Sequence, residues 1–118
     1  MSVEYVNIHG NITNYEDIDK VYLKIKSLIT EHLDFSENID EVIKKIDDDV
    51  VFDIYECYGY YGAITNYFEK EFLNEFPGAK FHYGVEIYWD NGEIENFHIE
   101  CDGKNIRSKD DEYLVEKV

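Results

Sequence analysis

A chain of 118 residues has the usual length of one domain with one hydrophobic core. Its formal charge of −16, from 27 acidic and 11 basic residues, argues against direct binding of nucleic acid, which depends on Lys and Arg at the phosphates. Aromatic side chains make up 16% of the residues, which argues against a disordered acidic tail and favours a folded protein with a charged surface.

The amino terminus and the two cysteines bear on the compartment. The first ten residues carry neither a basic leader nor an apolar run, and no stretch of the sequence approaches the roughly 18 consecutive apolar residues of a membrane helix. We therefore expect a soluble, cytoplasmic protein that does not bind membranes. Cys57 and Cys101 are then expected to stay reduced, and the fold is expected to need no metal or other cofactor.

The first third of the sequence predicts a strand and two helices. Apolar and polar residues alternate over residues 3–8, as in a half-buried strand. Apolar residues then recur at helical spacing, and Thr13 offers a capping box, which together predict a long amphipathic helix over residues 14–33. Ser36 can cap a second, shorter helix over residues 37–46.

The middle of the sequence predicts a second strand and a third helix. Residues 50–57 are rich in β-branched and aromatic side chains, which favours a strand. A tyrosine-rich loop over residues 58–62 is expected to follow. A stripe of Ile and aromatic residues then predicts a helix over residues 63–76, ended by Pro77.

A three-stranded antiparallel meander is predicted near the carboxyl end, with strands over residues 81–89, 93–101 and 104–107. A three-residue loop, with Gly92 in the left-handed conformation, is expected to join the first two strands, because this register gathers apolar residues on one face. The expected pairs are Val85 with Phe97, Tyr83 with Ile99, and Phe81 with Cys101.

The second turn of the meander and the last segment complete the predicted fold. A tight turn at Asp102 and Gly103 is expected to place Ile106 opposite Ile99 on the same apolar face. Residues 108–118 fit either a capped helix or an edge strand. The whole pattern predicts one α+β domain over residues 1–118, in which a mostly antiparallel sheet of about five strands packs against two to three helices.

Common enzyme signatures are absent from the sequence, which has no glycine-rich phosphate loop and no HExxH, Gly-x-Ser-x-Gly, CxxC or EF-hand pattern. The predicted register does bring His82 opposite Glu100 and places His98 on the same face. Two imidazoles and one carboxylate can bind a divalent metal or share a proton. The other interpretation of this face is a solvated polar surface. His9 and His32 are each isolated and predict no site.

The acidic residues are concentrated in two zones. Residues 34–56 contain nine acids and two lysines, and the segment between Lys80 and Lys104 contains six acids and no base. An Asp triplet, residues 47–49, follows the predicted second helix, at the end where the helix dipole disfavours negative charge. Such zones suit a basic partner surface, and carboxylates about 6.5 Å apart along a strand can imitate phosphates. The alternative is an acidic surface that only confers solubility.

Tyrosines adjoin the first acidic zone. The predicted loop over residues 58–62 is either a plain connection or a contact loop, and tyrosine suits contact because it offers a large area at a small entropic cost. No residue is expected to be catalytic. The residues expected to bind a partner are Asp47, Asp48, Asp49, Asp53, Glu56, Tyr58, Tyr60, Tyr61, Glu93 and Glu95.

These features predict a non-enzymatic inhibitor that binds the basic nucleic-acid-binding or catalytic surface of a nuclease, with carboxylates in the place of phosphates. In its general character, small, acidic and tyrosine-rich, the chain resembles toxin immunity proteins and phage-encoded inhibitors of restriction or CRISPR nucleases. That resemblance of composition implies a protein partner, and either toxin immunity or phage counter-defence. The alternative is a small metal-dependent enzyme or ligand-binding domain that uses His82, His98 and Glu100.

Overall fold

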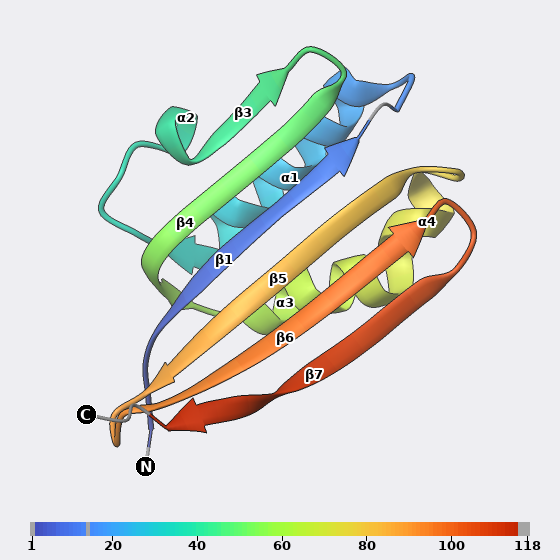
Figure 1. The fold of residues 1–118 in the computed structure, drawn as a ribbon. Helices are drawn as coiled ribbons and strands as arrows, with labels where there is room; N and C mark the ends of the chain where they lie inside the picture. The colour runs from blue at the N-terminus through green and yellow to red at the C-terminus, as the bar shows by residue number, and fades with distance from the viewer. Residues whose placement is uncertain (1, 14, 116–118) are drawn as a thin grey trace.

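The computed structural model of the protein describes residues 2–13 and 15–115, with side chains up to Lys109, and shows an α+β fold (Figure 1). Its elements are β1 (Val3–Thr13), α1 (Ile18–His32), β2 (Leu33–Asp34), α2 (Ile39–Val42), β3 (Ile43–Ile46), β4 (Asp49–Gly59), α3 (Tyr61–Asn66), the π-helical η1 (Tyr67–Glu71), α4 (Phe72–Glu75), β5 (Lys80–Trp89), β6 (Glu93–Asp102) and β7 (Ile106–Val115). In this part of the chain seven strands form one sheet in the order β2–β4–β1–β5–β6–β7, with β3 also beside β4. Every strand pair is antiparallel, so the predicted class is confirmed, with more strands than expected.

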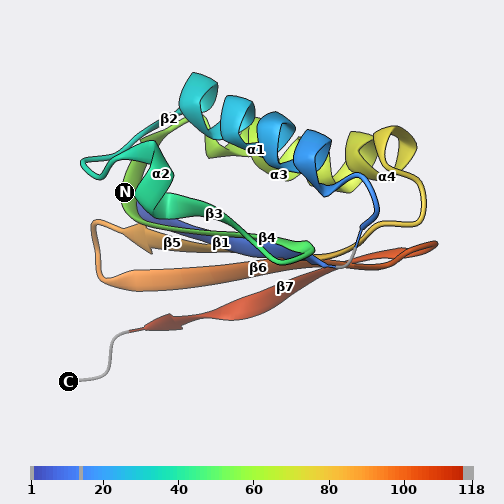
Figure 2. The ribbon, with the colours of Figure 1, turned by 90° about the horizontal axis from the view of Figure 1, so that it is seen from above.

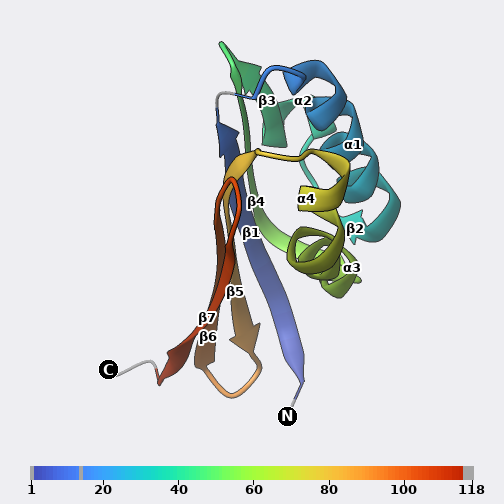
Figure 3. The same cartoon turned by 90° about the vertical axis from the view of Figure 1, so that its right-hand side faces the viewer.

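The sheet has one covered face and one open face. Figures 2 and 3 show α1, α3 and α4 on a single side of it. Strand alternation explains the arrangement, because Val6, Ile8 and Ile12 of β1 are buried toward the helices while polar residues lie between them. The matching buried stripe of α1 consists of Ile18, Val21, Ile25 and Ile29. The core therefore lies between the helices and the covered face.

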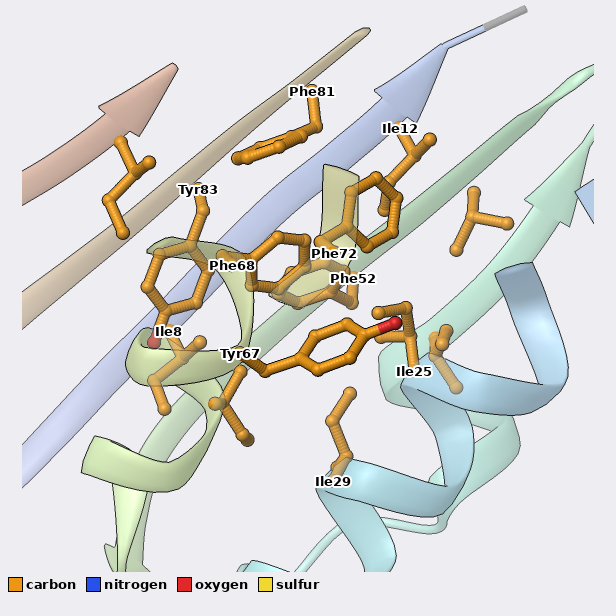
Figure 4. Close-up of a cluster of buried hydrophobic side chains, with 14 of the residues drawn as sticks. Ile8, Ile12, Ile25, Ile29, Phe52, Tyr67, Phe68, Phe72, Phe81 and Tyr83 are labelled. Carbon is orange, nitrogen blue, oxygen red and sulfur yellow. The ribbon is translucent and has the colours of Figure 1, made fainter. Parts of the chain in front are cut away.

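An aromatic cluster fills the core between the sheet and the helical run α3–η1–α4 (Figure 4). Phe68 is fully buried there and stacks on Tyr83 of β5, with ring centroids 4.8 Å apart. The Phe68 ring also lies 5.0 Å from Phe81 and 6.0 Å from Phe52 of β4. Aromatic pairs of this kind contribute about 0.5–1.5 kcal/mol each beyond the area they bury. Phe68 thus joins η1 to both β4 and β5.

The third predicted helix is present as the continuous run α3–η1–α4. Its single widened turn, η1, buries both Tyr67 and Phe68. The predicted loop over residues 58–62 is wrong, because β4 continues through Gly59 and α3 begins at Tyr61, which leaves Tyr60 as the connection. Gly59 permits this abrupt change, since its φ of 106° is left-handed and a side chain there would strike the His32 backbone oxygen.

The second predicted helix is a helix over four residues only, and its last four residues form a strand. α2 spans only Ile39–Val42, and the residues after it form β3, which pairs with β4. Pairing places Ile43 opposite Phe52 in the core, a gain that outweighs the helical spacing of this segment. Asp47 and Asp48 consequently form a two-residue hairpin turn, with Asp47 left-handed at a φ of 54°. The helix-dipole argument for these acids is therefore wrong, because they end no helix.

The first strand and first helix differ from the prediction at their shared boundary. β1 runs to Thr13 rather than to residue 8, and α1 begins at Ile18 rather than at residue 14. The predicted capping box at Thr13 is wrong, since Asp17 is the residue that precedes the helix. β1 is longer because it lies between β4 and β5 and its backbone finds hydrogen-bond partners on both sides.

The first hairpin of the meander is confirmed. The loop between β5 and β6 has three residues, Gly92 is left-handed at a φ of 90°, and Val85 lies opposite Phe97. The other two predicted pairs, Tyr83 with Ile99 and Phe81 with Cys101, are present as well. Face matching was sufficient here because a slip of one residue would have turned the apolar side chains toward water.

The second turn of the meander lies one residue later than predicted. The Asp102 carboxylate accepts hydrogen bonds from the backbone N–H groups of Lys104 and Asn105, at 3.0 and 2.8 Å, which fixes the turn after Asp102. Ile106 therefore lies opposite Cys101 rather than Ile99, although still on the covered face. β7 continues to Val115, so the undecided segment is a strand that far, and residues 116–118 lie outside the described residues.

The cysteines are placed too far apart to join. Cys57 lies on β4 and Cys101 on β6, and both thiols are buried. β1 and β5 lie between those strands, which separates them by about 14 Å, twice the span of a disulfide. An intrachain disulfide is therefore incompatible with this sheet.

None of the described helices combines the length and the apolar character that crossing a membrane requires.

Buried thiol and phenol groups predict a loss of stability in alkali. Burial raises the pKa of the Cys57 thiol from 9.0 to about 11. Between those values the unfolded thiol ionises and the folded one stays protonated, so the free energy of unfolding falls as pH rises. Burial raises the pKa values of Tyr67 and Tyr83 as well, which extends the loss above the usual tyrosine range.

This alkaline loss can be measured by urea unfolding at about pH 8, 9 and 10. We expect the urea concentration at the midpoint of unfolding to fall steadily as pH rises. In Cys57→Ala this concentration should fall less steeply between pH 9 and 10, because the variant lacks the buried thiol. An identical pH dependence in the wild type and Cys57→Ala would show that this thiol contributes nothing.

Candidate functional site

The open face of the sheet carries the two groups of side chains that are candidates for function. None of the described helices lies on this side (Figures 2 and 3). β1 crosses the middle of it and presents Tyr5, Asn7, His9 and Asn11 in alternation. Tyr5 and Asn7 belong to a group of acids and tyrosines toward one end of the sheet, and His9 belongs to a histidine cluster further along.

The first group, here called the acid–tyrosine face, spans the adjacent strands β4, β1 and β5. Its members are Tyr5, Asp53, Tyr55, Glu56, Tyr58, Glu86 and Tyr88. The Tyr5 and Tyr88 rings stack with centroids 4.6 Å apart, and the Tyr55 hydroxyl donates to an Asp53 carboxylate oxygen at 3.1 Å. Tyr55 and Tyr58 are each more than half exposed, at 57% and 55%. Large aromatic side chains and carboxylates are thus available together at the surface.

A bulge in β4 and the buried amide of Asn7 position two of these acids. Val6 pairs with Cys57 but Ile8 pairs with Ile54, so β4 has one extra residue opposite Asn7. The bulge holds Glu56 at a φ of 53°, a left-handed conformation that a residue other than Gly adopts at a cost of about 1–2 kcal/mol. The Asn7 side-chain oxygen accepts from the Glu56 backbone N–H at 2.8 Å, and its NH₂ donates to the Glu86 carboxylate at 3.2 Å.

The phenols of this face lie in a negative potential. The pKa of Tyr5 is raised, first by burial and then by the charges of Glu56, Glu4 and Glu86. The pKa of Tyr55 is raised mainly by its hydrogen bond to Asp53, with Glu86 contributing from a distance. Carboxylates from three strands therefore act on the Tyr5 ring, and Glu86 acts on both Tyr5 and Tyr55.

The structure separates the Asp triplet from the other residues that the sequence assigned to the first acidic zone. Asp53, Glu56 and Tyr58 lie on the acid–tyrosine face. Residues 47–49 lie at the hairpin turn at the opposite end of β4, where Asp49 is about 23 Å from Glu56 and about 13 Å from Asp53 along the extended strand. The ten predicted contact residues therefore do not form one patch.

The other four predicted contact residues lie toward the helical side. Tyr60, 69% exposed, and Tyr61 line a groove of about 890 Å³ beside α1, where the Tyr60 ring meets His32 edge-on at 6.4 Å. Glu95 is half-buried on the covered face, accepts a hydrogen bond from the Trp89 indole at 2.9 Å and adds to the raised pKa of Tyr61, which is due first to burial. Glu93 is half-buried at the start of β6.

The second group on the open face is a cluster of three histidines from three adjacent strands. His9 of β1, His82 of β5 and His98 of β6 each offer a ring nitrogen, and these atoms all lie within 4.8 Å of one another. Ring centroids are 5.6 Å apart for His9 and His82, 6.2 Å for His9 and His98, and 5.5 Å for His82 and His98. All three side chains are half-buried. The prediction that His9 stands alone is wrong.

Glu100, the predicted third member, lies beside this cluster rather than within it. It sits opposite His82 on β6, as predicted, and its side chain is exposed. His82, His98 and Glu100 line a hollow of about 400 Å³ together with Arg107 and Lys109 of β7. Burial lowers the pKa of His82, the neighbouring imidazoles lower it further, and Glu100 opposes them. The neutral imidazole that binds metals is therefore the favoured form.

Sequence reasoning missed His9, Tyr5 and Tyr88 for one physical reason. Their neighbours are set by the pairing of β1 with β5, two strands that lie about 75 residues apart in the chain, and no local pattern encodes that pairing. The alternation of Tyr5, Asn7, His9 and Asn11 is a signal that β1 has a polar face.

Comparison of the chain with protein-family models, with curated proteins and with solved structures finds no match.

Proposed function

We propose that this protein is a non-enzymatic inhibitor that binds the basic nucleic-acid-binding or catalytic surface of a nuclease, and that the acid–tyrosine face is the contact. The observation that carries the proposal is the meeting of Asp53, Glu56 and Glu86 with four tyrosines on one side of three adjacent strands. Carboxylates on such a face speed and orient the approach of a basic partner, and desolvated tyrosines supply the lasting affinity.

Two features of the face favour recognition of a partner over mere solubility. Its carboxylates stand on paired strands, where alternate positions lie about 6.6 Å apart and neighbouring strands about 4.8 Å apart, so that they form a fixed array of negative charge. The strained bulge at Glu56 is held by a buried Asn7 amide, and strain of this kind is characteristic of functional positions. Solubility alone requires neither a fixed array nor strain.

The experiment compares two triple variants of equal charge. The first neutralises the face, as Asp53→Asn, Glu56→Gln and Glu86→Gln, and the second neutralises the hairpin turn, as Asp47→Asn, Asp48→Asn and Asp49→Asn. The partner is recovered by pull-down from native or phage-infected cells, and binding is followed by surface plasmon resonance over a range of salt concentrations. We expect the first triple to slow association about 10- to 100-fold at low salt and to flatten the salt dependence.

The hairpin-turn triple serves as the matched control and should change the association rate by less than about threefold, because it lies outside the contact. Tyr55→Ala should instead speed dissociation about tenfold or more with little effect on the salt slope, as for an aromatic anchor. A partner that binds equally well in near-molar salt and tolerates the first triple would refute the proposal and leave the acidic surface as a solubility device. A purified partner without nuclease activity would refute the assignment of partner class.

A further inference from the structure

The histidine cluster lies on the same sheet face but involves none of the residues of the acid–tyrosine face. We propose that His9, His82 and His98 bind one divalent transition-metal ion of the zinc type through their ring nitrogens, with a remaining coordination position open to solvent. The two sites share no residue, although His9 lies opposite Asp53 on the neighbouring strand, and each proposal has its own test.

The arrangement of the three rings suits a single ion. Metal–nitrogen bonds of about 2.0–2.1 Å at a tetrahedral angle place neighbouring ligand nitrogens about 3.4 Å apart. The ring nitrogens here already converge to within 4.8 Å, and rotation about the side-chain torsions of these half-buried residues closes the difference. Each ligand comes from a different strand of the sheet, so the backbone beneath the site is rigid.

Gly84 supplies a second and independent indication of a site. It lies in the middle of β5, directly between His9 on one neighbouring strand and His98 on the other. A Cβ atom at Gly84 would lie 2.5 Å from His9 Nε2 and 3.2 Å from His98 Nδ1, so any side chain would push the imidazoles apart. Glycine weakens a strand interior, and its use there is typical of places where a ligand approaches the backbone.

The ligand atoms select the class of metal. Imidazole nitrogen suits zinc, nickel, cobalt and copper ions, whereas magnesium and calcium require oxygen ligands. Three histidines leave one tetrahedral position for water or another small ligand. The adjoining hollow contains Arg107 and Lys109 as well as Glu100, so a water molecule or a small anion at that position would meet both donors and an acceptor.

The test uses the full chain without a histidine tag, stripped of metal by dialysis against chelator. Titration with ZnCl₂ in a calorimeter should show one ion per chain with a dissociation constant of about 10 μM or tighter. CoCl₂ should give the visible absorption of a tetrahedral cobalt site, and MgCl₂ and CaCl₂ should give no heat. Saturating zinc should also raise the melting temperature by several degrees, because it binds the folded state selectively.

Variants of the histidines decide where the ion binds. His9→Ala, His82→Ala and His98→Ala should each weaken zinc binding by at least tenfold, and Gly84→Ala should do so without removing a ligand. His32→Ala is the matched control, since this fourth histidine lies at the end of α1 on the other side of the sheet and its loss should change nothing. Circular dichroism verifies that each variant is folded. A dissociation constant weaker than about 100 μM, or equal binding by wild type and His82→Ala, overturns the proposal. Equal loss in His32→Ala also overturns it, because the binding would then be unspecific.

Discussion

Phe68→Ala is expected to lower the free energy of unfolding by about 3–5 kcal/mol, the usual cost of truncating a buried aromatic residue. Phe68 is fully buried in η1 and touches rings from both layers, namely Phe52 of β4, Phe81 and Tyr83 of β5, and Phe72 of α4. Its removal leaves a cavity where these elements pack together, and the sheet beneath is too rigid to collapse into it. A domain of this size is stable by about 5–15 kcal/mol, so the variant should be close to unfolding at 37 °C.

Urea unfolding followed by circular dichroism measures this loss. Phe68→Leu keeps most of the volume and should cost about 1–1.5 kcal/mol, and Tyr60→Ala, at a strongly exposed ring, should cost less than about 0.5 kcal/mol. If Phe68→Ala lowered the free energy of unfolding no more than Phe68→Leu, the aromatic ring contacts of Phe68 would not hold the helical run on the sheet.

Asn7→Leu is expected to lower the free energy of unfolding by about 2 kcal/mol, even though leucine is apolar and close to asparagine in volume. The reason is that the Asn7 side chain accepts from the backbone N–H of Glu56 in the bulge, and a leucine leaves that donor without its partner. The hydrogen bond to the Glu86 carboxylate is lost as well, which frees this acid to move. Stability and the geometry of the acid–tyrosine face should therefore suffer together.

Amide hydrogen exchange separates this mechanism from a general loss of packing. The Glu56 amide should exchange faster in Asn7→Leu by a larger factor than amides of the β5–β6 hairpin. Asn11→Leu, four residues along on the same face of β1, is the matched control and should leave the Glu56 amide protected. Unchanged protection of the Glu56 amide in Asn7→Leu would show that the amide bridge does not hold the bulge.

Local sequence pattern was sufficient where neighbours in the sheet are neighbours in the chain. The register and the loop of the β5–β6 hairpin were predicted correctly, because turn chemistry at Gly92 and the match of Val85 with Phe97 act within twenty residues. The local pattern failed at β3, where Ile43 and Ile46 fit a helical stripe equally well and pairing with β4 makes the segment a strand. A short apolar segment without a strong turn signal does not distinguish a helix from a strand.

The candidate sites divide in the same way. His82, His98 and Glu100 were predicted together because one hairpin register brings them together, whereas His9 joins them only through the pairing of β1 with β5. The acids were found by composition, but composition does not say which of them share a face. Asp53 and residues 47–49 were grouped by closeness in sequence, and the extended strand between them places the triplet at the other end of the sheet.

The central position of β1 has a consequence for synthesis on the ribosome. Ile8 pairs with Ile54 on one side and with Val85 on the other, so its second partner is made 77 residues later. At about 5–20 residues per second, β1 waits about 4–15 s after its own synthesis before β5 exists to cover it. Throughout that interval β1, which contains two valines and two isoleucines, has at least one open edge, and an open edge is a template for pairing with a second nascent chain.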